Sequence, residues 1–475
     1  MVNWAFGCLF LPLVSAADLF YEHLQFVDWS MDPCHNFYRH VCPETLRDEE
    51  TVVRKFFDQD LLNYWIKDER KMSALELAIP LAKRHWLSPP DIQEANRAQK
   101  FLQALRIRDD VLDYIDQNNL LPQSYYYQVR EKIGQIVAVI KDEISNSTYD
   151  QMDLATKQFF EGQAANTIIE IGMSNFVSRR FNHTDFYWVL NKLYEAQPTQ
   201  GSSLSSLRAV VNLVILINKV EGFAIPNANR MLKGIEFGAV NFEGEYVMIP
   251  ESVCLMARTT SESAWYGSMG VIVAHELQHS LFWDKGQAHN AFTRDQKLRE
   301  SRECLEDHVM RVCRMFNHDF WNHSTPCIEA GSSSTRVCSC MEAAGKTYTE
   351  DVADQEGIQA AYQAMKRTLG PEKMQEPAYK DYPEVTNEKM FFYATAAVNC
   401  ATDPNLHYRE GSEHSAKYLR TMAEMTLMPE FRRVFQCSDD SRMGQLSVAR
   451  SNNCDQYGTT KRRMLQERVL KSHIR

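Results

Sequence analysis

The sequence predicts a mainly α-helical protein with a small β-sheet, an α+β fold divided into two lobes. Apolar side chains recur at helical spacing through much of residues 46–170 and again after residue 349. Two short β-type segments, residues 238–242 and 245–249, flank Glu243-Gly244 and fit a hairpin. The chain has 475 residues, more than one ordinary core accommodates, and this length favours two lobes.

The first residues are typical of a secretory signal peptide. Residues 4–14 are almost wholly apolar, and Val14-Ser15-Ala16 fits a small-residue cleavage site. We therefore expect a signal peptide over residues 1–16, with a buried N-terminal helix as the alternative. No stretch is long and apolar enough to predict a transmembrane helix.

Other features also favour a secreted, extracellular protein. The chain has twelve cysteines, which suit an oxidising compartment. Sequons begin at Asn146, Asn182 and Asn322. If the apolar N-terminus remained uncleaved, the protein would instead be anchored at the cell surface. The formal net charge of −10 disfavours nucleic acid and anionic membranes as partners.

The remaining elements follow in order along the chain. Residues 46–200 are expected to form a helical lobe, and its boundary falls in the Gln197–Ser203 stretch, which has the composition of a linker. The predicted hairpin follows this linker. After the hairpin, helices are expected over about 261–283, 349–368, 387–399 and 412–434, with a loop over 371–383.

The strongest chemical signal is His275-Glu276-Leu277-Gln278-His279, an H-E-x-x-H pattern in an apolar run. Positions four apart share one face of a helix, so His275 and His279 can direct their imidazoles at one metal ion. Glu276 lies beside them, where its carboxylate can accept a proton from water. These residues are the minimum set for zinc-assisted peptide hydrolysis.

A zinc site of this kind needs a third protein ligand, and Glu350 is the candidate. Asp354 lies one turn later on the same helical face, where it can accept a hydrogen bond from a ligand histidine. A second interpretation is structural. Thr347-x-x-Glu350 also fits a capping box, with Asp351 and Asp354 as charges favoured near a helix start.

Four dispersed motifs resemble those of the neprilysin and endothelin-converting-enzyme family of zinc endopeptidases, which are thermolysin-like gluzincins. Besides H-E-x-x-H, residues 349–354 (TEDVAD) are similar to the family's third-ligand motif. Residues 32–42 (DPCHNFYRHVC) resemble its D-P-C-x-x-F-Y-x-x-x-C segment. His414 and Arg420 have the spacing of the family's C-terminal catalytic His and substrate-binding Arg.

The resemblance implies a zinc endopeptidase acting on peptides, with one Zn²⁺ per chain. It implies a thermolysin-like catalytic domain over residues 201–475 and a helical lid lobe before it. It also implies a role for each site residue: metal ligation by His275, His279 and Glu350, catalysis by Glu276, Asp354 and His414, and substrate binding by Asn241 and Arg420.

The same resemblance implies disulfides that tie an N-terminal segment, residues 17–45, to the catalytic domain. Cys34 would pair with Cys437, and Cys42 with Cys400. Cys454 would pair with a cysteine after the zinc-binding helix. Three cysteines are candidates for that partner: Cys304, Cys313 and Cys327.

The chain also departs from the family pattern. Asn241 is followed by Phe242-Glu243, and Gln278 replaces the usual Thr before the second zinc histidine. The interval of about 43–235 is much shorter than the family's lid region, so we predict a reduced lid and a more open cleft. These departures leave open a second function, that of a catalytically weak or inactive binding or scaffold protein.

Overall fold

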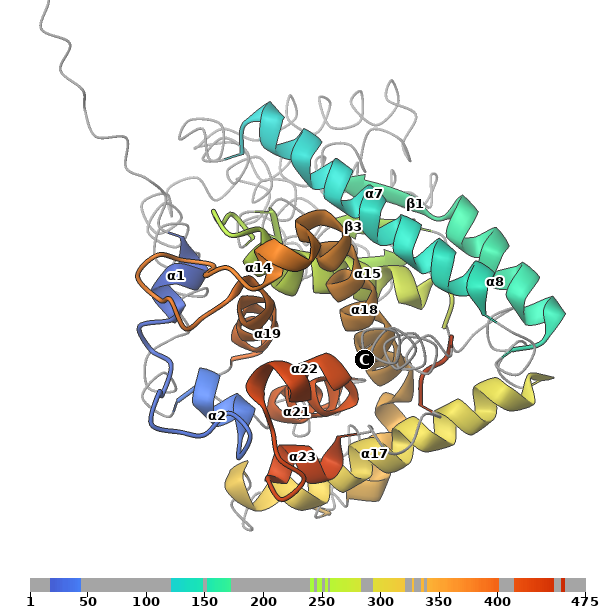
Figure 1. Ribbon diagram of the computed structural model, residues 1–475. Coiled ribbons are helices and arrows are strands. Elements are labelled where there is room, and N and C mark those ends of the chain that lie inside the picture. Colours follow the sequence, from blue (N-terminus) through green and yellow to red (C-terminus); the bar gives the residue numbers. More distant parts are fainter. Residues whose placement is uncertain are drawn as a thin grey trace, which may run out of the picture.

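The structure is a computed structural model, and it is mainly helical with two small sheets (Figure 1). This confirms the predicted fold class. The structure describes residues 18–43, 121–147, 152–171, 240–242, 246–249, 253–254, 257–282, 294–320, 327–328, 335–336, 340–400, 414–447 and 454–457. The predicted signal peptide, the 197–203 linker, the sequons at Asn182 and Asn322 and most of the predicted lid lie outside these residues.

Helices account for most of the described residues. They are α1 (Leu19–His23), α2 (Phe37–Val41), α7 (Gln123–Asn146), α8 (Leu154–Asn166), α14 (Glu262–Trp265), the π-helix η2 (Tyr266–Gly270), α15 (Val271–His279), α17 (Gln296–Phe320), α18 (Cys340–Met374), α19 (Asn387–Ala397), α21 (Lys417–Leu427), α22 (Pro429–Phe435) and α23 (Arg442–Leu446). The strands are β1 (Ile168–Ile171), β2 (Val240–Phe242), β3 (Tyr246–Ile249), β4 (Cys327–Ile328) and β5 (Thr335–Arg336).

The predicted hairpin forms the larger sheet together with a strand that the sequence does not predict. β2 pairs antiparallel with β3, and Asn241 lies opposite Val247. β1 pairs with the other side of β3 in parallel, so β2 is at the edge of this three-stranded sheet. The helical prediction is therefore wrong for residues 168–170. Their partner strand is remote in sequence, so local periodicity does not reveal the pairing.

The predicted helix over 261–283 is present, but it has three parts. Ser261 begins α14 by accepting a hydrogen bond from the Ala264 backbone N–H at 3.2 Å. The chain then passes through η2 into α15. η2 lies against α19, where the Thr395 hydroxyl donates to the Gly267 carbonyl at 2.9 Å. A Cβ at Gly267 would be 2.2 Å from the Phe391 carbonyl oxygen, so only glycine permits this approach.

The predicted helix over 349–368 is longer at both ends. α18 begins at Cys340 and bends at Gly370, which has a φ of 72° before Pro371. Residues 371–374 are helical, so the predicted loop over 371–383 begins too early. The predicted helix over 412–434 is divided into α21 and α22 at Met428, because Pro429 cannot continue the hydrogen-bond ladder of the preceding helix.

The core surrounds the contact between α15 and α18, which lie side by side near the centre of the molecule (Figure 1). α7 lies against these two helices and buries one face, formed by Val129, Ile133, Ile136, Ile140 and Ile144. α17 and α21 also pack against α18. The fold therefore encloses the two helices that carry the predicted metal ligands.

Three disulfides among the described residues join distant parts of the chain. Cys34 pairs with Cys437 and Cys42 with Cys400, which confirms the two pairings implied by the family resemblance. Among the three candidates, Cys304 is the partner of Cys454. None of the described helices is both long and apolar enough to cross a membrane.

Candidate metal centre

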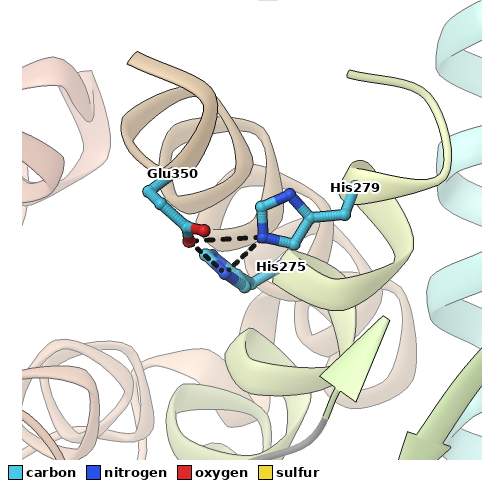
Figure 2. Close-up of side chains that lie close together, drawn as sticks. All are labelled: His275, His279 and Glu350. Carbon is cyan, nitrogen blue, oxygen red and sulfur yellow. Dashed lines mark hydrogen bonds and ion pairs between the residues drawn. The ribbon is translucent and has the colours of Figure 1, made fainter. Parts of the chain in front are cut away.

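The site begins with two histidines on α15. His275 and His279 are one turn apart, both side chains are buried, and their Nε2 atoms lie 3.0 Å from each other (Figure 2). The helix continues directly from η2, whose packing on α19 fixes its direction. The helical spacing thus brings both imidazoles to one point, as the sequence pattern predicts.

The third group comes from α18. The Oε2 atom of Glu350 lies 3.2 Å from His275 Nε2 and 3.3 Å from His279 Nε2 (Figure 2). α18 can approach α15 this closely because Gly357 has no side chain. A Cβ at Gly357 would lie 2.8 Å from the His275 backbone nitrogen.

The structure does not support the capping-box interpretation of Thr347-x-x-Glu350. Thr347 lies inside α18 rather than at its start, and its hydroxyl donates to Asp351 at 2.6 Å. Thr347 therefore caps no helix.

The three facing atoms fit a cation. Asp354 Oδ1 lies 2.7 Å from His275 Nδ1, which places the ring proton of a neutral His275 on Nδ1. His275 Nε2 then faces the carboxylate oxygen of Glu350, so either a proton or a metal cation can lie between these two atoms. Ligand atoms about 2.1 Å from a tetrahedral zinc ion are roughly 3.4 Å apart, close to the observed spacing.

The charges around these residues also suit a cation. Burial disfavours ionisation of Glu350, but the neighbouring His279 and hydrogen bonds from His275, His279 and His414 hold the pKa of Glu350 well below its usual range. Burial likewise disfavours the charged form of His275. The negative charge and hydrogen bond of Asp354, with contributions from Glu350 and Glu276, nevertheless raise the pKa of His275 to about 10. The carboxylates of Glu350 and Asp354 thus favour positive charge at the ring nitrogens of His275, where a metal ion would bind.

Asp354 links the first histidine to α21. Arg420 donates from Nε to Asp354 Oδ2 at 2.7 Å and from Nη2 to Asp354 Oδ1, a two-point pairing of guanidinium and carboxylate. Burial opposes the charge on Asp354, but Arg420 and His275 hold its pKa far below the usual value. Because the carboxylate stays ionised, it can keep the His275 ring in one orientation and tautomer.

Glu276 lies next to the two histidines and is partly buried. Burial raises its pKa, opposed by the two histidines and by a hydrogen bond from the Asn241 backbone. A carboxylate with a raised pKa is a better proton acceptor than an ordinary surface glutamate.

His414 also reaches this centre. Its Nε2 lies 3.0 Å from Glu350 Oε2, and its ring stacks at 6.3 Å on that of His275. Burial lowers the pKa of His414. His414 and Arg420 thus lie on one side of the centre, brought there by α21 and the residues just before it.

Asn241 lies at the same centre, but its amide faces the helix. Its Nδ2 donates to the Glu276 carbonyl at 2.6 Å and to the Ser280 hydroxyl at 2.8 Å. Ser280 therefore helps to fix Asn241 against α15. The predicted substrate contact of Asn241 stays a prediction.

The structure brings all eight predicted site residues to one region. Two further positions, Gly357 and Ser280, shape the site without carrying its chemistry. Sequence reasoning assigns neither a role, because each acts through a close contact between segments far apart in the chain.

The sequence is similar to those of known proteins over the part of the chain that carries this site. Residues 255–450 match the family model described as peptidase family M13. Neprilysin-3 of Drosophila melanogaster is 27% identical over 181 residues, which cover 38% of this chain and 21% of that protein. Neprilysin-1 of Caenorhabditis elegans is 27% identical over 324 residues, 62% of this chain and 38% of that protein. The chain thus spans less than two fifths of the length of either relative.

A crystal structure of PEPO from Lactobacillus rhamnosis is similar over 72% of this chain and 49% of its own, with a TM-score of 0.47 and 16% identity. The family match spans most of the described site, from α15 through His414 and Arg420. The sequence matches therefore make residues 255–450 similar to peptidase family M13, and parts of the chain similar to neprilysins.

Proposed function

We propose that this protein is a zinc-dependent metalloendopeptidase that hydrolyses peptide bonds in peptides, with one Zn²⁺ per chain. The observation that carries the proposal is the convergence of His275, His279 and Glu350 within 3.0–3.3 Å, with Asp354 behind His275. The match of residues 255–450 to peptidase family M13 supports a metallopeptidase in general. The geometry supports the specific assignment of residues.

His275, His279 and Glu350 would hold the ion and leave a fourth position open. When bound, zinc supplies Lewis-acid chemistry that polarises a carbonyl and makes water more acidic. Glu276 accepts the proton of the attacking water in this proposal and passes it to the leaving amine, a task that its raised pKa favours. No acyl-enzyme is needed, because water attacks directly.

His414 and Arg420 are proposed to act on the substrate. His414 lies beside Glu350, where its ring can donate a hydrogen bond to an oxyanion. Arg420 is held from one side by Asp354, and its remaining N–H groups can donate to a substrate carbonyl. Asn241 is proposed to bind substrate backbone from β2, the edge strand of its sheet.

We also propose an extracellular location. The three disulfides among the described residues support an oxidising compartment. The alternative function, a weakly active or inactive scaffold, is favoured by one observation. The Asn241 amide nitrogen donates to α15 rather than into the proposed cleft.

One experiment tests both functions. The purified protein is analysed for zinc and then assayed with a quenched-fluorescent peptide library, with and without a chelator. Cleavage that the chelator abolishes and added zinc restores is the expected result. One zinc per chain without cleavage of any peptide would instead establish the scaffold function.

A further inference from the structure

A short C-terminal segment, residues 454–457, contacts both helices that carry the metal ligands. The Tyr457 hydroxyl donates to Gln278 Oε1 on α15 at 2.7 Å. The Gln456 backbone N–H donates to Glu356 Oε1 on α18 at 2.9 Å. All four partners in these two hydrogen bonds are fully buried: Tyr457, Gln278, Gln456 and Glu356.

The partners of this segment are adjacent in sequence to site residues. Gln278 immediately precedes His279 and lies three residues after His275. Glu356 follows Asp354 by two residues, and Gly357 contacts the backbone of His275. The C-terminal segment is thus hydrogen-bonded to α15 at the residue before His279, and to α18 two residues after Asp354 and six residues after Glu350.

The segment is itself firmly held. Cys454 is bonded to Cys304 on α17, which is a third helix of the core. The Tyr457 ring contacts Phe282, three residues after α15, with 5.8 Å between ring centroids, and Phe160 of α8 at 6.4 Å. A segment fixed by a disulfide and by aromatic contacts can restrain the helices to which it is hydrogen-bonded.

We propose that Tyr457 and Gln278 are positioning residues for the metal site. The segment 454–457 fixes α15 relative to α18, and thereby the two histidines relative to Glu350. A metal site tolerates ligand displacements of only about 0.5 Å, so a restraint on both helices is felt in metal affinity. The inference rests on the proposed zinc site but not on peptidase activity.

The Gln278 amide makes the hydroxyl of Tyr457 especially important. Within the described part of the chain, Gln278 Nε2 has no hydrogen-bond partner, and its Oε1 accepts from Tyr457. Removal of the Tyr457 hydroxyl would leave a buried amide without this bond. The Gln278 side chain would then move, and the backbone of α15 between the two histidines would follow.

The test measures zinc affinity by competition with a chromophoric chelator in Tyr457→Phe, Gln278→Met and the double variant. We expect each single variant to bind zinc at least tenfold more weakly than the unchanged protein, in the range of about 10- to 100-fold that such supporting contacts contribute. The double variant should be no weaker than the weaker single variant, because both changes remove one interaction. The visible spectrum of the Co²⁺-loaded protein should change in all three.

The matched control is Tyr393→Phe, which removes the hydroxyl of another buried tyrosine. Tyr393 Oη lies 2.8 Å from His40 Nε2, on α2 rather than on a ligand helix. Its zinc affinity and Co²⁺ spectrum should equal those of the unchanged protein, while the thermal midpoint of the metal-free form falls.

Zinc affinity within twofold of the unchanged protein in folded Tyr457→Phe would overturn the proposal. So would additive losses in the double variant. An equal loss of affinity in Tyr393→Phe would show a general effect of destabilisation and would also overturn it. If no variant cleaves peptides but the affinities differ as expected, the positioning role stands and only the proposed activity fails.

Discussion

Asp354 contacts His275 and Arg420 at once: its Oδ1 lies 2.7 Å from the His275 ring nitrogen, and its Oδ2 accepts from Arg420 Nε at 2.7 Å. The carboxylate therefore connects the metal side of the site with the substrate side. A change at Asp354 should affect both metal binding and substrate binding. A change at His275 should affect metal binding alone, and a change at Arg420 should affect substrate binding alone.

Replacement of Asp354 tests this connection. Asp354→Asn removes the charge that orients His275, so we expect zinc to bind about 10- to 100-fold more weakly. The Michaelis constant for a peptide should also rise, because Arg420 loses its counter-charge. Zinc competition and steady-state kinetics measure the two effects. Asp295→Asn, at a buried aspartate that caps α17, serves as the control and should leave zinc affinity unchanged.

Replacement of Glu276 separates proton transfer from metal binding. Glu276→Gln keeps the shape of the side chain but cannot accept a proton, so we expect zinc content of one per chain and a loss of kcat of at least about 10²-fold. Atomic absorption and single-turnover assays measure these quantities. The exposed Glu300→Gln serves as control. Substantial turnover in purified Glu276→Gln would remove Glu276 from the role of base.

Gly357 is predicted to be intolerant of any side chain. In Gly357→Ala the new Cβ would lie 2.8 Å from the His275 nitrogen, which is backbone and cannot rotate away. We expect a loss of about 1–3 kcal/mol in the free energy of unfolding, the cost of overpacking a core, together with weaker zinc binding. Urea denaturation of the metal-free protein measures the first effect.

Gly134→Ala on α7 is the matched control, since a Cβ there would meet no atom within 4 Å. It should be neutral or stabilising by up to about 1 kcal/mol, because alanine favours the helix. Equal stabilities for the two variants would contradict the close helix contact.

Because His308 is buried, we expect the protein to lose stability in acid. Burial, with a smaller effect of Arg311, lowers the pKa of His308 to about 3, compared with about 6.5 in an unfolded chain. Between pH 3 and pH 6.5 the unfolded state binds a proton on this histidine that the folded state does not bind. The contribution of neutral, buried His308 to the free energy of unfolding is therefore complete above pH 6.5 and is lost as the pH falls toward 3. It amounts to a few kcal/mol, because a pKa difference of one between the folded and unfolded states corresponds to about 1.4 kcal/mol.

The measurement is urea denaturation of metal-free protein at pH 7 and pH 5, for the unchanged protein and for His308→Gln. In His308→Gln the free energy of unfolding should decrease less between pH 7 and pH 5 than it does in the unchanged protein. The exposed His35→Gln should show the unchanged decrease. An unchanged decrease in His308→Gln would show that other groups, such as the buried His23 with its pKa lowered to about 4, account for the acid sensitivity.

The sequence predicts those parts of the site whose geometry is local. His275 and His279 share a face because any helix places positions four apart together. Glu350 is about 70 residues further along the chain, and its residue pattern alone also fits a capping box. The family resemblance identifies it, as it does His414, Arg420 and the disulfide partners.

Contacts between remote segments are not predictable in this way. The residues of β1 fit a helical pattern until their parallel partner β3 is known. The hydrogen bond between Tyr457 and Gln278 joins residues 179 positions apart, and no periodicity indicates it. The close approach at Gly357 likewise depends on how α15 and α18 cross.

The disulfide between Cys34 and Cys437 has a consequence for biosynthesis. These residues are 403 positions apart, so at about 5–20 residues per second the ribosome completes Cys437 roughly 20–80 s after Cys34. During that time Cys34 and Cys42, only eight positions apart, are available to each other. A nascent chain would therefore benefit from a disulfide isomerase, and reoxidation of the reduced, unfolded protein should pass through forms in which these two cysteines are wrongly joined.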